Sequence, residues 1–466
     1  MSILKRLFTI EGILKNKEIK GKLPSGKKIF KETFDAAWPS TVESVFIALM
    51  SSVDIIMVGS LGAIAVSSIA ICTNPRFIIL APTLALNTTV VVLIARRKGE
   101  NNKKAANDYL LMTVILSTII SFIMCFIGYL FAEPFLKFAG AKTDYLPEAL
   151  RYFKMMLIGQ FFASVGLTMT SAQRAVGKTK ISLITNSSAN ILNIIFNFLL
   201  IHGYFGFPAL GVFGAAVATT IGNIASFIIA TINILMPNQF ISLRINPISE
   251  FGKKIKDVFK ISQNALVEQA FLRIGFFLFA KAVASLGTNE FAAHTVVLNL
   301  LTITFAFGDG LQIANTSLVG RSLGAGRDDL AIVYTRIAKY IGLFLGMLVM
   351  IAVLIFVDEI PKIFINDPAV IKFTKIPLYY LVAIIFFQIS VVITMGSLRG
   401  AGDLRFTAFI VIICIGILRP ILSNFLIHIM NLALNGAWLS LFIETLIRFI
   451  MAQLRYNKGE WRYIKL

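Results

Sequence analysis

Long apolar runs recur along almost the whole of this 466-residue chain, roughly once every 35 residues, and each is close to the ~20 residues that a helix needs to cross a bilayer. The chain is 57% hydrophobic with a mean hydropathy of +0.81, which is too apolar for a soluble protein of this length. Helices satisfy their own backbone hydrogen bonds in lipid. The runs therefore predict an all-α polytopic membrane protein.

Twelve transmembrane helices are expected, and the basic residues cluster in the segments on one side of them. The predicted spans are residues 36–58, 64–94, 107–131, 147–172, 181–202, 209–235, 260–284, 290–319, 334–357, 376–397, 406–428 and 434–454. The formal net charge is +20, and basic loops stay on the cytoplasmic side of a membrane. Both termini are therefore predicted to be cytoplasmic, in a multi-pass protein of the cell membrane.

An internal repeat divides the spans into two halves. A shift of 225 residues over about 135 positions aligns identical residues, among them Glu43 with Glu268, Arg96 with Arg321 and Arg174 with Arg399. Six spans in each half give both halves the same orientation. We expect two six-helix lobes related by a pseudo-twofold axis normal to the membrane. The predicted parts are an N-terminal tail (1–33), an N-lobe (34–236), a cytoplasmic connector (237–260), a C-lobe (261–454) and a C-terminal tail (455–466).

Asp54 lies deep in the first span, where a charge is costly and usually faces a bundle interior or a water-filled path. It is a protonatable or cation-binding carboxylate, the partner of Arg76 in a salt bridge, or both, because a switchable pair is one way to couple protonation to movement. Glu43 lies eleven residues earlier on nearly the same side of the helix. Glu43 and its repeat-equivalent Glu268 either brace the inner ends of their helices or contact an ion or substrate.

The fifth span carries asparagines at positions four, three and four apart, which places them on one helix face: Asn186, Asn190, Asn193 and Asn197. Their amides either coordinate Na⁺ through their oxygens, or form hydrogen bonds to a protonated Asp54, or join helices to one another.

Further charges inside the spans are interpreted mainly as structural; they are Arg273, Lys281, Asp309, Arg419, Glu444 and Arg448. Glu444 and Arg448 are four residues apart and are expected to pair. Asp309 is the exception with a candidate functional role, and its position between two glycines predicts a break in the eighth span.

Several classes of activity find no support in the sequence. Gly177-Lys178-Thr179 lacks the earlier glycine of a phosphate-binding loop, because Ala172 occupies that position, so no nucleotide site is expected. No cluster of His, Cys or paired acids indicates an enzyme, a cofactor or a metal centre beyond a Na⁺ near Asp54. The basic residues lie in membrane loops, which argues against nucleic acid as a partner.

The combination of motifs resembles the multidrug and toxic compound extrusion (MATE) family, in particular its NorM- and DinF-like members. The motifs are Pro39 with Val53-Asp-Ile-Ile-Met-Val-Gly59, Arg96 to Gly99, Gln173 to Lys180, Arg321 to Gly326 and Ser397 to Asp403. The resemblance implies twin helix bundles that alternate between outward- and inward-open states and export organic cations and amphiphiles in exchange for Na⁺ or H⁺.

Within that family the first-span aspartate, which matches Asp54, is central to coupling. Some members carry an asparagine and an aspartate that match Asn193 and Asn197, and others carry an acid that matches Gln388. Both acids are amides here, so two-carboxylate and C-lobe cation sites are not expected. The alternative function is a flippase for a lipid-linked precursor, which needs a basic cavity; Arg76, Arg273, Lys281 and Arg419 keep that alternative open. The transporter is expected to be monomeric and to contact membrane lipid.

Overall fold

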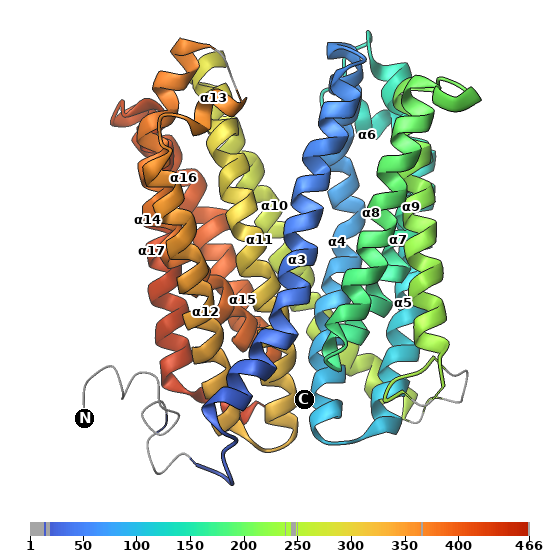
Figure 1. Cartoon of the computed structure of the whole chain (residues 1–466), viewed down its shortest axis with the longest axis vertical. Coiled ribbons are helices and arrows are strands. Elements are labelled where there is room, and N and C mark those ends of the chain that lie inside the picture. Colours follow the sequence, from blue (N-terminus) through green and yellow to red (C-terminus); the bar gives the residue numbers. More distant parts are fainter. Residues whose placement is uncertain are drawn as a thin grey trace. The chain divides into compact units, whose positions relative to one another are not determined.

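The computed structural model describes residue 14 and residues 19–237, 239–243, 248, 250–364 and 367–464. Figure 1 shows that long helices running side by side make up nearly all of the described chain. Within it, ten helical segments are long and apolar enough to cross a membrane. Together with α3 (Gly26–Gly59) and α10 (Phe251–Ala284), they account for the twelve predicted spans.

The other ten spans form in the predicted order. They are α4 (Ala63–Gly99), α5 (Lys103–Leu130), α7 (Leu146–Ala175), α8 (Thr179–His202), α9 (Gly211–Leu235), α11 (Thr288–Gly324), α12 (Asp328–Ile355), α14 (Pro368–Ala401), the continuous segment from α15 to η4 (Leu404–Ile429) and α17 (Ala433–Lys458). Short helices α6 (Ala132–Phe138) and α13 (Ile360–Phe364) lie between spans.

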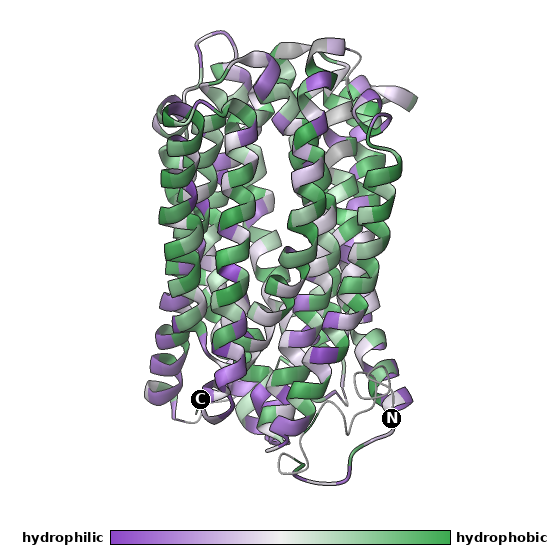
Figure 2. Cartoon of the chain, turned by 90° about the vertical axis from the view of Figure 1, so that its left-hand side faces the viewer, coloured by the Kyte–Doolittle hydropathy of each residue, from purple (hydrophilic) through white to green (hydrophobic). Residues whose placement is uncertain are grey.

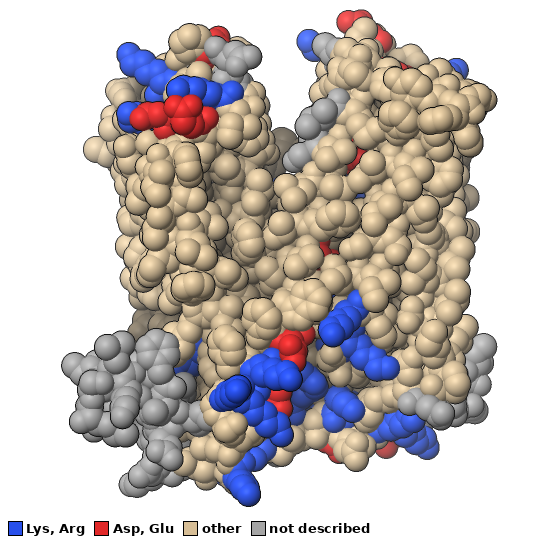
Figure 3. Space-filling view, in the orientation of Figure 1, with Lys and Arg blue, Asp and Glu red and all other residues tan. Residues whose placement is uncertain are grey.

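The helix surfaces suit a bilayer. Large apolar side chains such as Phe122, Phe126 and Leu130 of α5 are exposed, and Figure 2 shows hydrophobic residues along the middles of the helices. Hydrophilic residues gather toward the helix ends. Lys and Arg concentrate at one of these ends, as Figure 3 shows, and the last turn of α4 contributes Arg96, Arg97 and Lys98. The chain is therefore an integral membrane protein with a strongly basic end.

The chain packs into two compact units whose boundaries fall inside helices. Unit 1 consists of Met1–Ser44 and Val267–Leu466, and unit 2 consists of Val45–Leu266. Helix α3 thus passes from unit 1 into unit 2, and α10 passes from unit 2 into unit 1. The predicted lobes started at residues 34 and 261. Residues 34–44 and 261–266 therefore pack with the opposite half from the one to which their sequence repeat assigns them.

Helix α11 is unbroken, so the break that we predicted at Asp309 is wrong. The two neighbouring glycines allow close packing instead of a turn. A Cβ on Gly310 would clash with the backbone of Thr41, and a Cβ on Gly308 would touch Val392 at 3.6 Å. Both contacts lie within unit 1. Glycine in a membrane helix commonly serves this purpose, because neighbouring helices can approach it closely.

Two glycines of α14 bring this helix against α11. Gly396 and Gly400 lie one turn apart on the same face, in the spacing that favours helix–helix association in membranes. A Cβ on Gly396 would lie 2.7 Å from the side chain of Gln312, and a Cβ on Gly400 would clash with the carbonyl of Thr316. The α11–α14 contact is the most extensive helix pairing within the described part of unit 1.

Replacing Gly400 with alanine should destabilise the protein, because the new methyl group meets backbone that cannot rotate away. We expect a cost of about 1–3 kcal/mol and a lower thermal unfolding temperature in detergent. The control is Gly252→Ala on the exposed first turn of α10, where nothing lies within 4 Å of the added atom. Equal unfolding temperatures for the two variants would contradict the packing described here.

Candidate functional site

Asp54 lies on α3 within unit 2, half-buried, and Asn197 of α8 approaches it directly. The Nδ2 of Asn197 donates a hydrogen bond to Asp54 Oδ1 at 2.7 Å. The same nitrogen lies 3.2 Å from Oδ1 of Asn193, one turn earlier on α8. Both asparagines are buried. The structure therefore places the carboxylate of the first span against the polar face of the fifth.

The amide of Asn193 also reaches α9, where it contacts the hydroxyl of Thr219 at 3.1 Å. When this amide is turned so that its nitrogen faces Asp54, it donates to Oδ1 at 3.0 Å and its oxygen accepts from Thr219. Two amide nitrogens then face one carboxylate oxygen. Sequence reasoning missed Thr219, although a threonine pair inside the apolar run of the sixth span is a weak polar signal.

This group offers one carboxylate and several neutral oxygens. Within the described residues, Oδ1 of buried Asn197 makes no hydrogen bond, which leaves an acceptor for a proton donor or an oxygen ligand for a cation. The described chain contains no cluster of three or more His, Cys, Asp or Glu residues of the kind that holds a transition metal. The arrangement suits a proton or a monovalent hard cation, because hard cations prefer oxygen ligands.

Arg76 and Asn190 make no described hydrogen bond to Asp54, although Arg76 lies close enough to interact with it electrostatically. Arg76 Nε donates to Gln160 Oε1 at 3.0 Å, and Gln160 in turn contacts Ser164. Among the described contacts, Arg76 thus bonds to an amide and forms no ion pair with Asp54, but its charge still acts on Asp54, so the pairing of the two stays a prediction. Asn190 is half-buried on α8, and in the described part of the chain no hydrogen bond joins it to Asp54.

Glu43 and Glu268 are both buried at repeat-equivalent positions. Glu268 forms an ion pair with Arg399 of α14 and accepts a hydrogen bond from Thr407 of α15 at 2.9 Å. Three helices of unit 1 are joined through this one carboxylate, which supports the bracing interpretation of Glu268. Glu43 lies on the part of α3 that belongs to unit 1.

A buried ionic chain occupies the interior of unit 1, where the family resemblance placed a further acid. Gln388 of α14 accepts from Arg448 at 2.7 Å, and Arg448 pairs with Glu444 one turn away on α17 at 3.0 Å. Glu444 also accepts from Arg419 at 2.7 Å. The predicted Glu444–Arg448 pair is confirmed, with Arg419 added. Gln388 is thus engaged by a fixed cation.

Asp309 sits near the middle of α11 with an exposed side chain. No hydrogen bond or ion pair engages it within the described residues. An exposed carboxylate at this depth usually faces water or a polar cavity rather than lipid. Asp309 therefore stays a candidate contact for a substrate, separate from the group around Asp54.

Replacing Glu444 with glutamine should strongly destabilise unit 1, because it leaves two buried arginines without their shared carboxylate. Removing one partner of a buried pair costs about 3–5 kcal/mol. The measurement is the thermal unfolding temperature in detergent. Glu133→Gln is the control, since Glu133 forms only an exposed pair with Lys137 and should leave the temperature unchanged. An unchanged temperature in Glu444→Gln would rule out a stabilising role for the chain.

Comparison with known families gives one matching model, MatE, and it matches twice. The matches cover residues 39–199 and 265–425, so they start almost as far apart as the two halves of the internal repeat. A relative in Thermotoga maritima, "Probable multidrug resistance protein NorM", is 27% identical over 70% of each chain. "Uncharacterized transporter YisQ" of Bacillus subtilis is 24% identical over 92% of this chain and 94% of its own.

Solved structures share the fold. "Crystal structure of MATE in complex with MaL6" aligns with a TM-score of 0.86 at 18% identity, over 92% of this chain and 97% of that one. "Reverse polarity of binding pocket suggests different function of a MOP superfamily transporter from Pyrococcus furiosus Vc1 (DSM3638)" aligns with a TM-score of 0.85 at 19% identity, over 95% of this chain and all of the other. At this sequence identity, the two structures show only that the helices of this chain are arranged in the same fold.

Proposed function

Because this chain belongs to the MatE family of multidrug efflux transporters, we propose that it exports cationic or amphipathic organic compounds in exchange for H⁺ or Na⁺. The observation that supports ion coupling is the position of Asp54. This carboxylate lies inside a membrane helix, and its described hydrogen-bond partner is an amide, which donates to the carboxylate without cancelling its charge. Binding of a proton or Na⁺ would neutralise the negative charge of Asp54, which the amide hydrogen bonds leave in place.

Cation binding at Asp54 would change the polar contacts between α3 and α8. With Asp54 ionised, the Asn197 amide nitrogen donates to it. When a proton occupies Asp54, the carboxyl group gains an O–H donor while its other oxygen still accepts, and Oδ1 of Asn197 offers an acceptor for the new donor. Na⁺ would likewise draw the oxygens of Asp54 and Asn197 together. Either cation alters the α3–α8 contact and can bias the protein between an outward-open and an inward-open state that differ in substrate affinity.

The proposed substrates follow from the side chains of the helices and from the relatives. The chain contains 40 phenylalanines, whose ring faces attract organic cations. Exposed Asp309 adds a negative charge at membrane depth. Several relatives are named as multidrug resistance proteins. These features support export of organic cations. We further propose that the transporter works as a monomer in the cell membrane.

The proposed orientation places both termini in the cytoplasm. The last turns of α4, α7, α11, α14 and α17 carry basic residues, and each of these turns leads to the side on which the N-terminus starts in a twelve-span chain. Basic segments stay on the cytoplasmic side during membrane insertion.

The alternative, a flippase for a lipid-linked precursor, needs arginines and lysines free to bind a phosphate-rich head group. Two of the four residues that favoured it are engaged by side chains of this protein. Arg419 binds Glu444, and Arg76 binds Gln160. These bonds favour export of organic cations over lipid flipping.

The function is tested by efflux from proteoliposomes with a cationic dye, with Na⁺ and pH gradients imposed separately. We expect wild type to export dye, Asp54→Asn to lose the gradient-driven part, and the effective gradient to identify the coupling ion. The control is Asp144→Asn, an exposed loop acid that should export like wild type. Gradient-driven export by Asp54→Asn would show that coupling lies elsewhere, and no export by wild type would overturn the proposed function.

Asp309→Asn tests the substrate contact separately. Loss of its charge should weaken binding of cationic dyes and raise their half-saturating concentration, while an uncharged amphiphile is exported as before. The Na⁺ or pH dependence should stay that of wild type, because Asp54 is intact. Equal losses for charged and uncharged compounds would point to a structural role for Asp309 instead.

A further inference from the structure

Two tyrosine–carboxylate hydrogen bonds recur at equivalent positions of the internal repeat. Tyr334 of α12 donates to Glu32 on the first turns of α3, and Tyr109 of α5 donates to Asp257 on the first turns of α10 at 2.9 Å. The two tyrosines are 225 residues apart, and so are the two acids, which is the offset of the repeat. The same chemistry at matched positions on both halves argues against a chance contact.

Each bond joins the start of one half's first helix to the other half of the sequence. Glu32 and Tyr334 both belong to unit 1, and Asp257 and Tyr109 both belong to unit 2. Both tyrosines are buried, and each lies within the first two turns of its helix. A buried hydroxyl that donates to a carboxylate forms one of the stronger hydrogen bonds in a protein.

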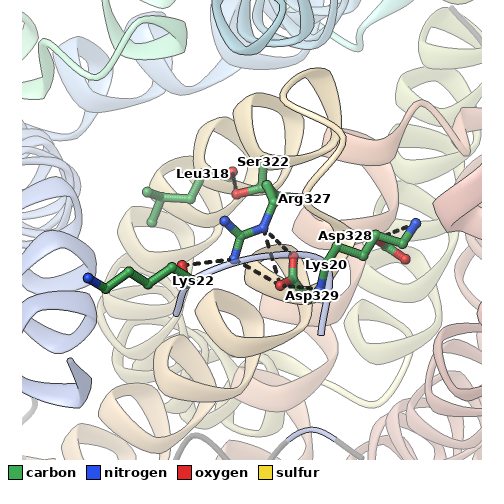
Figure 4. A network of polar contacts seen from close by, with 7 residues as sticks. All are labelled: Lys20, Lys22, Leu318, Ser322, Arg327, Asp328 and Asp329. Carbon is green, nitrogen blue, oxygen red and sulfur yellow. Dashed lines mark hydrogen bonds and ion pairs between the residues drawn. The ribbon is translucent and has the colours of Figure 1, made fainter. Parts of the chain in front are cut away.

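Additional contacts hold the segment around Glu32. Figure 4 shows the segment before α3, with Lys20 and Lys22, lying against Arg327, Asp328 and Asp329 at the start of α12. Lys20 Nζ pairs with Asp328 at 2.8 Å, which raises the pKa of Lys20, and its backbone N–H donates to Asp329 at 3.2 Å. Arg327 pairs with Asp329 at 2.9 Å and also reaches the carbonyl of Lys22. The bond to Asp329 raises the pKa of Arg327.

The segment around Asp257 is held in a comparable way. Lys254 forms a buried ion pair with Asp108, beside Tyr109. Asn107 donates to the carbonyl of Phe240 at 3.2 Å and accepts from the backbone of Ser242 at 2.7 Å. The beginning of the third span of each half therefore contacts the start of the other half's first span and the segment before it.

The opposite ends of α3 and α10 are bound within their own halves. Ser60, directly after α3, lies 3.2 Å from Nε2 of His202 on α8. Ser285, directly after α10, lies 3.2 Å from Nε2 of His428 on η4 (Phe425–Ile429). Each serine hydroxyl also contacts a backbone carbonyl three residues earlier. Each first helix is thus fastened to one half at its start and to the other at its end.

We propose that the Glu32–Tyr334 and Asp257–Tyr109 bonds are paired latches, and that their release is a required step of the transport cycle. This inference rests on the proposed function, because it assumes a cycle in which the two units move. Such movement must either bend α3 and α10 where they pass between units or detach their starts from the helices that hold them. Helix α3, which carries Asp54, is one of the two helices so held, so Tyr334 positions the coupling helix without touching the ion.

The first test removes only the hydroxyl groups, in Tyr109→Phe and Tyr334→Phe. Amide hydrogen exchange should accelerate in residues 251–266 for the first variant and in residues 26–44 for the second. A lost hydrogen bond to a charged group corresponds to a roughly tenfold faster local opening. Tyr379→Phe, at an exposed tyrosine of α14, is the control and should leave both segments unchanged. Unchanged exchange in both latch variants would overturn the latches themselves.

The second test prevents release. Cysteines at Glu32 and Tyr334, or at Asp257 and Tyr109, are joined by a short reversible bis-thiosulfonate crosslinker in protein reconstituted in liposomes. The native cysteines Cys72, Cys125 and Cys414 are buried and serve as the background. We expect the crosslinked protein to bind dye but to lose export, and a reductant to restore export. A crosslink between cysteines at Glu359, directly before α13, and Lys362, in its first turn, should have no effect.

The two tests separate failure of the latches from failure of the proposed function. Export at the uncrosslinked rate by a crosslinked latch pair would overturn the proposal that release is required. If wild type exports no dye, the proposed function fails and the release step fails with it. The hydrogen-exchange result still decides whether the two bonds hold the helix starts, because it requires no transport.

Discussion

An ionised side chain inside an apolar helix bundle must be neutralised or hydrogen-bonded, and the polar interior of this protein is organised by that requirement. Glu444 is neutralised by two arginines, and Glu268 by Arg399. These charges are fixed because each finds its counter-charge within the same unit. Asp54 differs from them, since its described hydrogen bond comes from an amide and Arg76 acts on it only as a nearby charge, without a described ion pair. A mobile cation can therefore compete for Asp54 in a way that it cannot compete for Glu444.

Most of the fold could be predicted from the sequence, because apolar runs of bilayer length leave few alternatives to a helix. Twelve spans and two repeated halves follow from the spacing of those runs and from one constant offset. The contact of Asp54 with the polar face of α8 could also be predicted, because four-residue spacing places Asn193 and Asn197 on one helix face. The contact of Thr219 could not be predicted, because two adjacent threonines in an apolar helix give only a weak polar signal without periodicity. The helix break predicted at Asp309 was wrong, because the neighbouring glycines Gly308 and Gly310 allow close packing with Val392 and Thr41.

The latches show a different limit of sequence reasoning. The repeat offset aligns Tyr109 with Tyr334 and Glu32 with Asp257, yet an alignment compares equivalent positions and does not say which positions touch. Each contact links one half to the beginning of the other, so it is invisible when the halves are compared as separate bundles. The predicted lobe boundaries failed to anticipate the exchange for the same reason: hydropathy marks where a helix crosses the membrane and carries no information about which neighbours it packs against.

The exchange of helix starts between the units has a consequence for biosynthesis. Residues 26–44 leave the ribosome long before the residues that they pack against, which lie from position 267 onward. Contacts of such long sequence separation form late and slowly. Unit 2 is continuous in sequence and can assemble while translation proceeds. The opening segment of α3 must wait in the membrane, without its final neighbours, until the second half has been inserted.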